Sequence, residues 1–337
     1  MFSLNTVGRC PLAAKKNHEA ATVVSIVLIG ILVIILGNRF PAKASAPGED
    51  AFPPLGIRLS QPVVTVGDIT IVEIDGQRKG PSLEDLGARF LDIVIPLFDH
   101  PIKGSDTRIG LIPIPYKTSP GVKTLFLEWT NSAGHHRHPI PLEIRGGRFQ
   151  SEKLQVTASR VIPPKKMMPR IQREREEIKA AYSRSQPLRC WDAPFQRPTT
   201  GKVTSAYGAQ RLLNGKLQRY HGGVDFRAAS GTPIYAANSG VVRLAKNLFY
   251  SGNHVILDHG EGLFTSYSHL SHIDVSTGQS VARGQVIGKS GSTGRVSGPH
   301  LHWSVKIHGV NVDPLRFIKA LDTLLDHQNP GFVAAPQ

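Results

Sequence analysis

Cysteine is almost absent from this chain of 337 residues, which contains only Cys10 and Cys190. Two cysteines exclude a zinc site built from cysteine pairs, and they exclude a fold held together by many disulfides. We also expect no disulfide between them, because the apolar segment described below would place them on opposite sides of a membrane. A metal site would therefore have to use histidine and carboxylate ligands.

Acidic residues are also scarce. The chain has 25 Asp and Glu against 40 Lys and Arg, which gives a formal net charge of +15. This excess favours anionic partners, among them anionic lipids and cell-wall polymers. The basic residues are spread along the chain, so a merely solvated basic surface is an equal alternative to polyanion binding. No helix-turn-helix, zinc-finger or aromatic–basic pattern occurs, and we expect no nucleic-acid partner.

One apolar run near the N-terminus bears on the compartment. Residues Ala21 to Gly37 form seventeen residues without a charge, and basic residues precede them at Arg9, Lys15 and Lys16. The length is at the short end of the transmembrane range, and the basic flank predicts a cytoplasmic N-terminus. We predict residues 1–46 to be a cytoplasmic tail and membrane anchor, with the rest of the chain on the periplasmic side. A signal peptide cleaved at the small residues of positions 42–46 is the alternative.

The remainder of the chain predicts a mainly β protein, rich in glycine and proline (33 and 25 residues). Turn signals separate short β-rich runs from 55 to 162, which predicts an N-terminal β-sandwich. Residues 163–187 predict a charged connecting helix, 188–320 a second β domain, and 321–337 a flexible tail. Within the first domain, His135, His136 and His138 could bind a metal, but their position after Asn-Ser-Ala-Gly is more typical of a polar hairpin tip.

Three elements in the second domain carry residue types suited to chemistry. In His221-Gly-Gly-Val-Asp225 the two glycines disfavour a helix, and in an extended segment both polar side chains face one side. In His300-Leu-His302, alternate residues of a strand also face one side. His269 follows a hairpin-like stretch and carries no information alone. Other histidines, such as His254 and His259, we interpret as surface or hydrogen-bonded core residues.

Together these elements offer two histidines and an aspartate, which with a water make the ligand pattern of catalytic zinc. Two further histidines would remain for proton transfer or transition-state stabilisation.

Residues 195–318 resemble the catalytic domain of lysostaphin-type (LytM-like) zinc metallopeptidases. The stretches that match, in the order of the family, are SAYG from Ser205, HGGVDF from His221, SGTPIYAANSGVV from Ser230, GNHVILDHGEGLFTSYSHL from Gly252, VSTGQSVARGQVIGKSGSTG from Val275 and SGPHLHW from Ser297. The family often continues with Phe-Glu where this chain has Trp303-Ser304. The β region and charged helix before this domain are more loosely similar to the N-terminal parts of envelope members.

The resemblance implies a peptidase domain built on an antiparallel β-sheet, and one zinc ion per chain held by His221, Asp225 and His302. It implies that His269 and His300 are the catalytic pair, and we assign His300 as the general base and His269 as the oxyanion stabiliser. Some members also use a tyrosine near the groove. Tyr207 and Tyr220 lie near in sequence, but neither maps onto it securely.

By resemblance, the chain would be a zinc-dependent endopeptidase that hydrolyses peptide cross-links of peptidoglycan in the cell envelope. Members that have lost ligands activate other wall hydrolases, so a non-catalytic regulator is the alternative, and a wall-binding scaffold is a third. The family divides between glycine-rich bridges and D-alanyl–diamino acid cross-links. The N-terminal segment and β domain favour the second substrate. Whether that domain positions the enzyme or shields its groove stays open.

Overall fold

The computed structural model describes residues 56–75, 86–131, 134–154, 163–213, 216–326 and 332–335. The expected membrane segment, Ala21 to Gly37, lies outside these ranges. No helix within them has the length and apolar character needed to cross a membrane.

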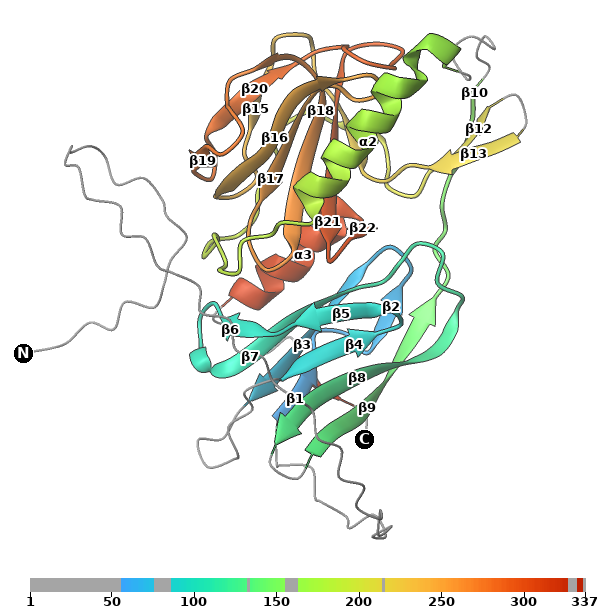
Figure 1. The fold of residues 1–337 in the computed structure, drawn as a ribbon. Coiled ribbons are helices and arrows are strands. Elements are labelled where there is room, and N and C mark those ends of the chain that lie inside the picture. Colours follow the sequence, from blue (N-terminus) through green and yellow to red (C-terminus); the bar gives the residue numbers. More distant parts are fainter. Residues whose placement is uncertain are drawn as a thin grey trace, which may run out of the picture.

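The N-terminal domain consists of two five-stranded sheets (Figure 1). The first has the order β23 (Val333–Ala334), β1 (Gly56–Leu59), β3 (Ile69–Asp75), β7 (Gly104–Pro113), β6 (Phe98–His100). The second has the order β2 (Val63–Thr65), β9 (Gly134–Arg145), β8 (Gly121–Asn131), β4 (Gly87–Phe90), β5 (Ile93–Pro96). Alternate apolar residues of both sheets, such as Val72 and Leu125, form one buried core. The predicted β domain is thus present as two packed sheets.

The C-terminal domain is built on a ten-stranded sheet. Its main path is β11 (Val203–Ser205), β14 (Val224–Arg227), β21 (His300–Ile307), β18 (Leu263–Ile273), β17 (Gly252–Asp258), β16 (Gly240–Leu248), β19 (Ser280–Val281). Three more strands attach to this path, β15 (Pro233–Tyr235), β20 (Val286–Ser290) and β22 (Val310–Val312). All its strand pairs are antiparallel, as predicted.

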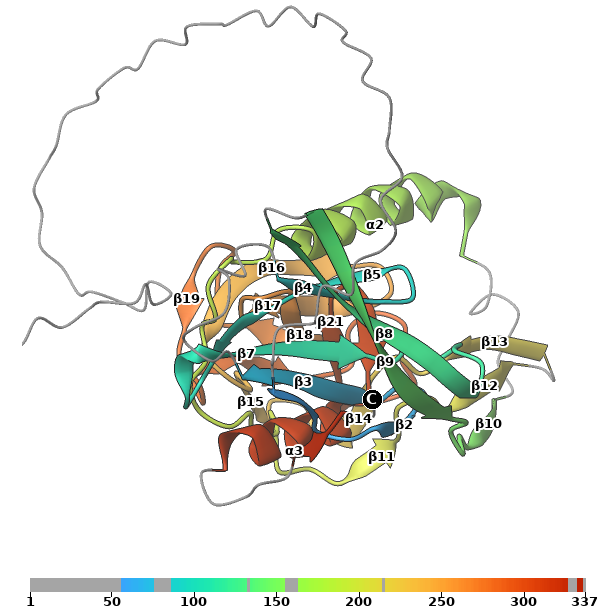
Figure 2. The ribbon, with the colours of Figure 1, turned by 90° about the horizontal axis from the view of Figure 1, so that it is seen from below.

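A small third sheet joins the two domains. Strand β10 (Ser151–Leu154) follows the N-terminal domain and pairs in parallel with β12 (Gln210–Leu213), which forms a hairpin with β13 (Lys216–Tyr220). Figures 1 and 2 both show these three strands together at one side of the molecule.

The connecting helix is α2 (Met168–Tyr182), preceded by a 3₁₀ turn at Lys165–Met167. A proline in its first turn supplies the φ that a helix start needs. Its thin apolar stripe, which includes Ile178 and Tyr182, packs on Leu248, Ile256 and Phe264 of the large sheet. The helix therefore lies across one face of that sheet (Figure 1).

Helix α3 (Pro314–Leu325) lies between the two domains (Figure 1). Asp313 caps it, accepting hydrogen bonds from the amides of Leu315 (2.9 Å) and Arg316 (3.4 Å). Its apolar face joins Ile69 and Ile71 of β3 to the core of the C-terminal domain, so one hydrophobic cluster spans the domain interface.

One expectation differs from the structure, and a second falls partly outside the described residues. We expected a flexible tail from residue 321, but α3 continues to Leu325 because Leu321 and Leu324 are buried, and Val333–Ala334 pairs with β1. The pairing partner lies in a distant part of the chain, so no local pattern marks it. We also expected no disulfide between Cys10 and Cys190, and Cys10 lies outside the described residues.

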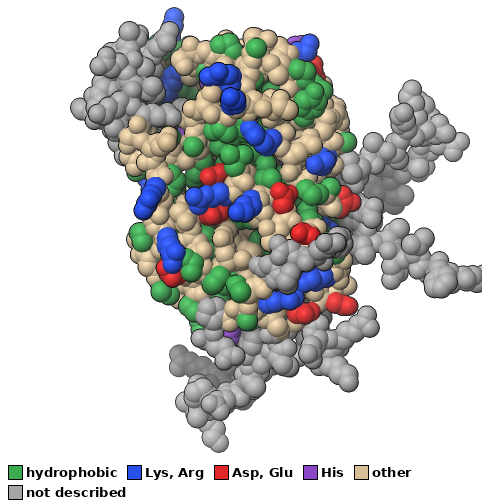
Figure 3. All heavy atoms as spheres, turned by 180° about the vertical axis from the view of Figure 1, so that it is seen from behind, with side chains coloured by type: hydrophobic (Ala, Val, Ile, Leu, Met, Phe, Trp, Pro, Cys, Tyr) green, Lys and Arg blue, Asp and Glu red, His purple; other side chains and the backbone are tan. Residues whose placement is uncertain are grey.

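The excess positive charge is dispersed on the face drawn in Figure 3. Lys and Arg side chains are scattered over that face, and several adjoin Asp or Glu. Among the described residues this face has no continuous basic patch, which agrees with a solvated basic surface.

Candidate metal centre and active site

Two of the expected metal ligands are direct neighbours on paired strands. Asp225 of β14 lies opposite His302 of β21 in the antiparallel ladder, and His300 lies opposite Arg227. Side chains opposite each other in such a pair are close and on the same face. The regular pairing of two strands therefore fixes an aspartate beside a histidine.

His221 reaches the same place through two glycines. It precedes β14, and a Cβ on Gly223 would lie 2.3 Å from the Trp303 carbonyl oxygen and 3.0 Å from Cε1 of His302. Only a residue without a side chain allows the chain to pass this close to β21. The His-Gly-Gly-Val-Asp spacing is thus a steric requirement as well as a ligand pattern.

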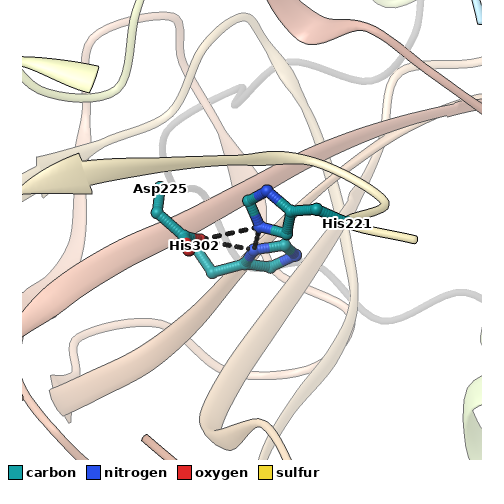
Figure 4. Close-up of side chains that lie close together, drawn as sticks. All are labelled: His221, Asp225 and His302. Carbon is teal, nitrogen blue, oxygen red and sulfur yellow. Dashed lines mark hydrogen bonds and ion pairs between the residues drawn. The ribbon is translucent and has the colours of Figure 1, made fainter. Parts of the chain in front are cut away.

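The three side chains converge on one point (Figure 4). Nε2 of His221 is 2.9 Å from Nδ1 of His302, and Oδ1 of Asp225 is 3.0 Å from the first atom and 2.8 Å from the second. These three residues are the one group within the described residues whose ligand atoms could hold a metal ion, all within 4.8 Å of one another. His135, His136 and His138 form no such group, and His136 stacks on Trp129 instead.

The hydrogen bond to its second ring nitrogen orients His221. Its Nδ1 donates to the Ala206 carbonyl oxygen at 2.9 Å, so in the neutral ring Nε2 carries the lone pair that a metal ion needs. Metal-ligating histidines commonly donate their other ring N–H in this way. Two imidazoles and a carboxylate form a suitable donor set for zinc, so the residues fit the ion implied by the resemblance.

Asp225 and His221 are buried, whereas His302 is partly exposed. Burial by itself raises the pKa of Asp225, but in the metal-free site the hydrogen bonds and charge that His221 and His302 supply when protonated outweigh it and hold that pKa far below its usual range. The carboxyl group is therefore ionised at neutral pH, as a ligand must be.

His269 reaches the site through a β-bulge. Ser268 and His269 together lie opposite His254, because the register between β17 and β18 shifts by one residue there. His269 has a φ of 66°, a left-handed conformation that is uncommon outside glycine. Its amide donates to the Ser251 carbonyl oxygen at 2.8 Å, which stabilises the bulge. Bulges of this kind re-aim a side chain, here toward the metal centre.

The imidazoles of His269 and His300 lie side by side, with ring centroids 4.9 Å apart. Nδ1 of His269 donates to the Thr293 carbonyl oxygen at 3.0 Å, and Nδ1 of His300 donates to the Gly298 carbonyl oxygen at 2.9 Å. Nε2 of His300 is 3.9 Å from Oδ1 of Asp225. Burial, followed by the nearby His302, lowers the pKa of His269 to about 4. In the neutral form both residues present an Nε2 lone pair.

The structure thus brings together all five residues singled out in the sequence, His221, Asp225, His269, His300 and His302. It adds three backbone carbonyls that orient their rings, those of Ala206, Thr293 and Gly298. Every residue has a carbonyl group, so the sequence of these three residues does not identify them. The only signal was that all three lie within stretches that match the family. Tyr207 is buried and donates to the Asn311 carbonyl oxygen at 2.8 Å, a bond within the core.

Comparison with known proteins agrees with this geometry. The family model described as Peptidase family M23 matches residues 219–314. A solved structure from Pseudomonas aeruginosa, described as a candidate M23 peptidase, is 30% identical, covers 77% of this chain and 96% of that chain, and has a TM-score of 0.57. This chain belongs to peptidase family M23. The likeness to the Pseudomonas structure extends beyond the residues that the family model matches.

Two curated relatives are similar within the catalytic region. The peptidoglycan DD-endopeptidase ShyA of Vibrio cholerae is 48% identical over 126 residues, which is 36% of this chain and 29% of that protein. The DD-carboxypeptidase/endopeptidase Mpg of Neisseria meningitidis is 38% identical over 136 residues, which is 40% of this chain and 31% of that protein. The chain therefore spans less than a third of the length of these M23 relatives.

Proposed function

We propose that this M23 chain is a zinc-dependent endopeptidase that hydrolyses peptide cross-links of peptidoglycan. The observation that carries the proposal is the convergence of His221, Asp225 and His302, with the imidazoles of His269 and His300 beside them. The names of the Vibrio and Neisseria relatives support a bond between D-amino acids as the substrate. This agrees with the D-alanyl–diamino acid cross-link favoured by the sequence.

Each residue has a specific task in this proposal. Zinc would lower the pKa of a water toward 7 and polarise the scissile carbonyl. His300 would accept the proton of the attacking water at Nε2, since its Nδ1 hydrogen is held by the Gly298 carbonyl. His269 would stabilise the oxyanion from Nε2 only in its doubly protonated form, which requires a proton from solvent because burial lowers its pKa to about 4, while its Nδ1 stays bonded to Thr293.

The test combines metal analysis with digestion of purified peptidoglycan by the full chain. We expect about one zinc per chain and release of cross-link peptides detected by mass spectrometry. His302→Ala should lose both. His272→Ala is the matched control, because His272 is an exposed histidine on the same strand as His269 and should leave both unchanged. A zinc-loaded wild type that releases no cross-link product would favour the alternative, a non-catalytic activator of other hydrolases.

We further propose that the protein acts in the cell envelope, anchored by Ala21–Gly37 with the catalytic domain on the periplasmic side. Relatives named as peptidoglycan hydrolases support the compartment. Membrane fractionation and N-terminal sequencing test the anchor: recovery of a soluble chain that begins after residues 42–46 would establish the cleaved-signal alternative.

A further inference from the structure

His221 is supported differently from the other two proposed ligands. Asp225 and His302 lie on paired strands, but His221 lies just before β14. Its backbone is held by residues 208–209 instead: the His221 amide donates to the Ala209 carbonyl (2.9 Å), and the Gly208 amide donates to the His221 carbonyl (2.8 Å). The position of this ligand therefore depends on the segment that contains Ala206, Gly208 and Ala209.

An aromatic side chain of the N-terminal domain contacts that segment. Tyr116, between β7 and β8, packs on Tyr220 with ring centroids 4.0 Å apart, and Tyr220 immediately precedes His221. The Tyr116 hydroxyl donates to the Gly208 carbonyl oxygen at 3.1 Å. One side chain thus contacts both the backbone of Gly208, which holds His221, and the ring of Tyr220, the residue before His221.

Phe149 completes this contact from the segment between β9 and β10. Its ring centroid is 4.5 Å from that of Tyr116. A Cβ on Gly208, whose φ is +80°, would lie 2.2 Å from the Phe149 ring. Two constraints therefore require glycine at position 208: the left-handed backbone conformation and the close approach of the Phe149 ring.

Strand β10 extends the same contact along the chain. It pairs with β12 from Ser151–Gln210 to Leu154–Leu213, and the Gln210 amide donates to the Gln150 carbonyl oxygen at 2.8 Å. Strand β12 in turn pairs with β13, which ends at Tyr220. The N-terminal part of the chain thus binds the β12–β13 hairpin at its base and along one edge (Figure 2).

We propose that Tyr116, Phe149 and β10 form a clasp by which the N-terminal domain positions His221 for metal binding. Tyr116 and Phe149 are positioning residues, because they touch the backbone around His221 and not the metal. The inference rests on the metal site proposed above. In this proposal the N-terminal domain helps to assemble the metal centre of the C-terminal domain.

The test compares variants at two points of the same domain interface. Tyr116→Ala removes the ring and hydroxyl from the clasp. Phe98→Ala is the matched control, because Phe98 packs edge-on against Trp191 with ring centroids 6.2 Å apart and has no part in the clasp. Zn²⁺ affinity is measured by competition with a chromophoric chelator, and folding by thermal unfolding. We expect Tyr116→Ala to weaken Zn²⁺ binding about tenfold, the scale typical when a group that orients a metal ligand is removed. Phe98→Ala should leave Zn²⁺ binding unchanged.

A second variant and a metal-free readout cover the remaining outcomes. Tyr116→Phe keeps the ring on Tyr220 and loses only the bond to Gly208, so it should fold and weaken Zn²⁺ binding about threefold. In metal-free protein, Tyr116→Ala should speed hydrogen exchange at the Gly208 and His221 amides, while Phe98→Ala should not. Unchanged affinity and exchange in both Tyr116 variants would overturn the clasp. If the wild type binds no Zn²⁺ but Tyr116→Ala still speeds exchange at these amides, only the proposed function is overturned.

Discussion

Gly223→Ala should damage the metal centre although position 223 carries no ligand. The new Cβ would lie 2.3 Å from the Trp303 carbonyl oxygen, a rigid backbone atom, and 3.0 Å from both Cε1 of His302 and Cβ of Ser304. Real Cβ atoms do not approach closer than 3.0 Å, so the chain at 223 must move away from β21 by at least ~0.7 Å. Asp225, two residues on, pairs with His302 across the same ladder and would move with it.

The size of the effect follows from this displacement. Overpacking of a rigid site costs about 1–3 kcal/mol of folding free energy. A ligand displaced by a substantial fraction of an ångström also loses metal affinity, and we expect a loss of about tenfold or more. Thermal unfolding of the metal-free protein measures the first quantity, and chelator competition with Zn²⁺ measures the second.

Gly222→Ala is the matched control for the same chemical change one residue away. Its Cβ would meet only the side chain of Asn311, at 2.6 Å from Nδ2, and the end of that side chain can move. The expected cost is the hydrogen bond from Asn311 to the Gly222 carbonyl, about 1 kcal/mol, with little effect on Zn²⁺ affinity. Equal behaviour of the two alanine variants would refute the steric reasoning.

Three further outcomes are expected. Removal of metal by a chelator should lower the midpoint of thermal unfolding and added Zn²⁺ should restore it, since a ligand of the folded state stabilises that state; His302→Ala should not respond. Burial lowers the pKa of His259 to about 4, against partial opposition from the Ser239 carbonyl and Asp258. Between pH 6.5 and 4 the unfolded chain binds a proton at this histidine and the folded chain does not. The free energy of unfolding should therefore fall by up to about 1.4 kcal/mol per pH unit over that range. Urea titrations should show this slope, and His259→Gln should flatten it. His254 bonds the Ser268 hydroxyl at 3.0 Å opposite the bulge, so His254→Leu should lower kcat about tenfold at unchanged zinc content while His254→Asn retains most activity.

The sequence predicted side-chain directions best where the pattern lies within a single strand. The two-residue period predicted that His300 and His302 face one side, and in the structure both rings lie within 3.9 Å of Oδ1 of Asp225. The two glycines after His221 likewise predicted an extended segment, and Val224–Arg227 is a strand. These inferences succeed because neighbouring residues alone decide them.

His269 shows why the same rule has a limit. A regular strand that points Ser268 toward the site would point His269 to the other face. The bulge reverses this, and it depends on the Ser251 and Thr293 carbonyls, which lie elsewhere in the sequence. The parallel pairing of β10 with β12 and the pairing of Val333–Ala334 with β1 depend on distant partners in the same way. For the same reason His254 and His259 could be assigned to the hydrogen-bonded core without their partners being known.

The helix α2 limits how a substrate can reach the site. On β21, His302, Ser304 and Lys306 face the same side of the sheet. The side chain of His302 is 23% exposed, but Ser304 is buried, and Nζ of Lys306 lies 5.0 Å from the centre of the Tyr182 ring of α2. An extended peptide therefore cannot follow β21 past Ser304. An approach from the side of His300 and His269 avoids this contact, so α2 limits access along one end of β21, while the clasp supports the ligand His221.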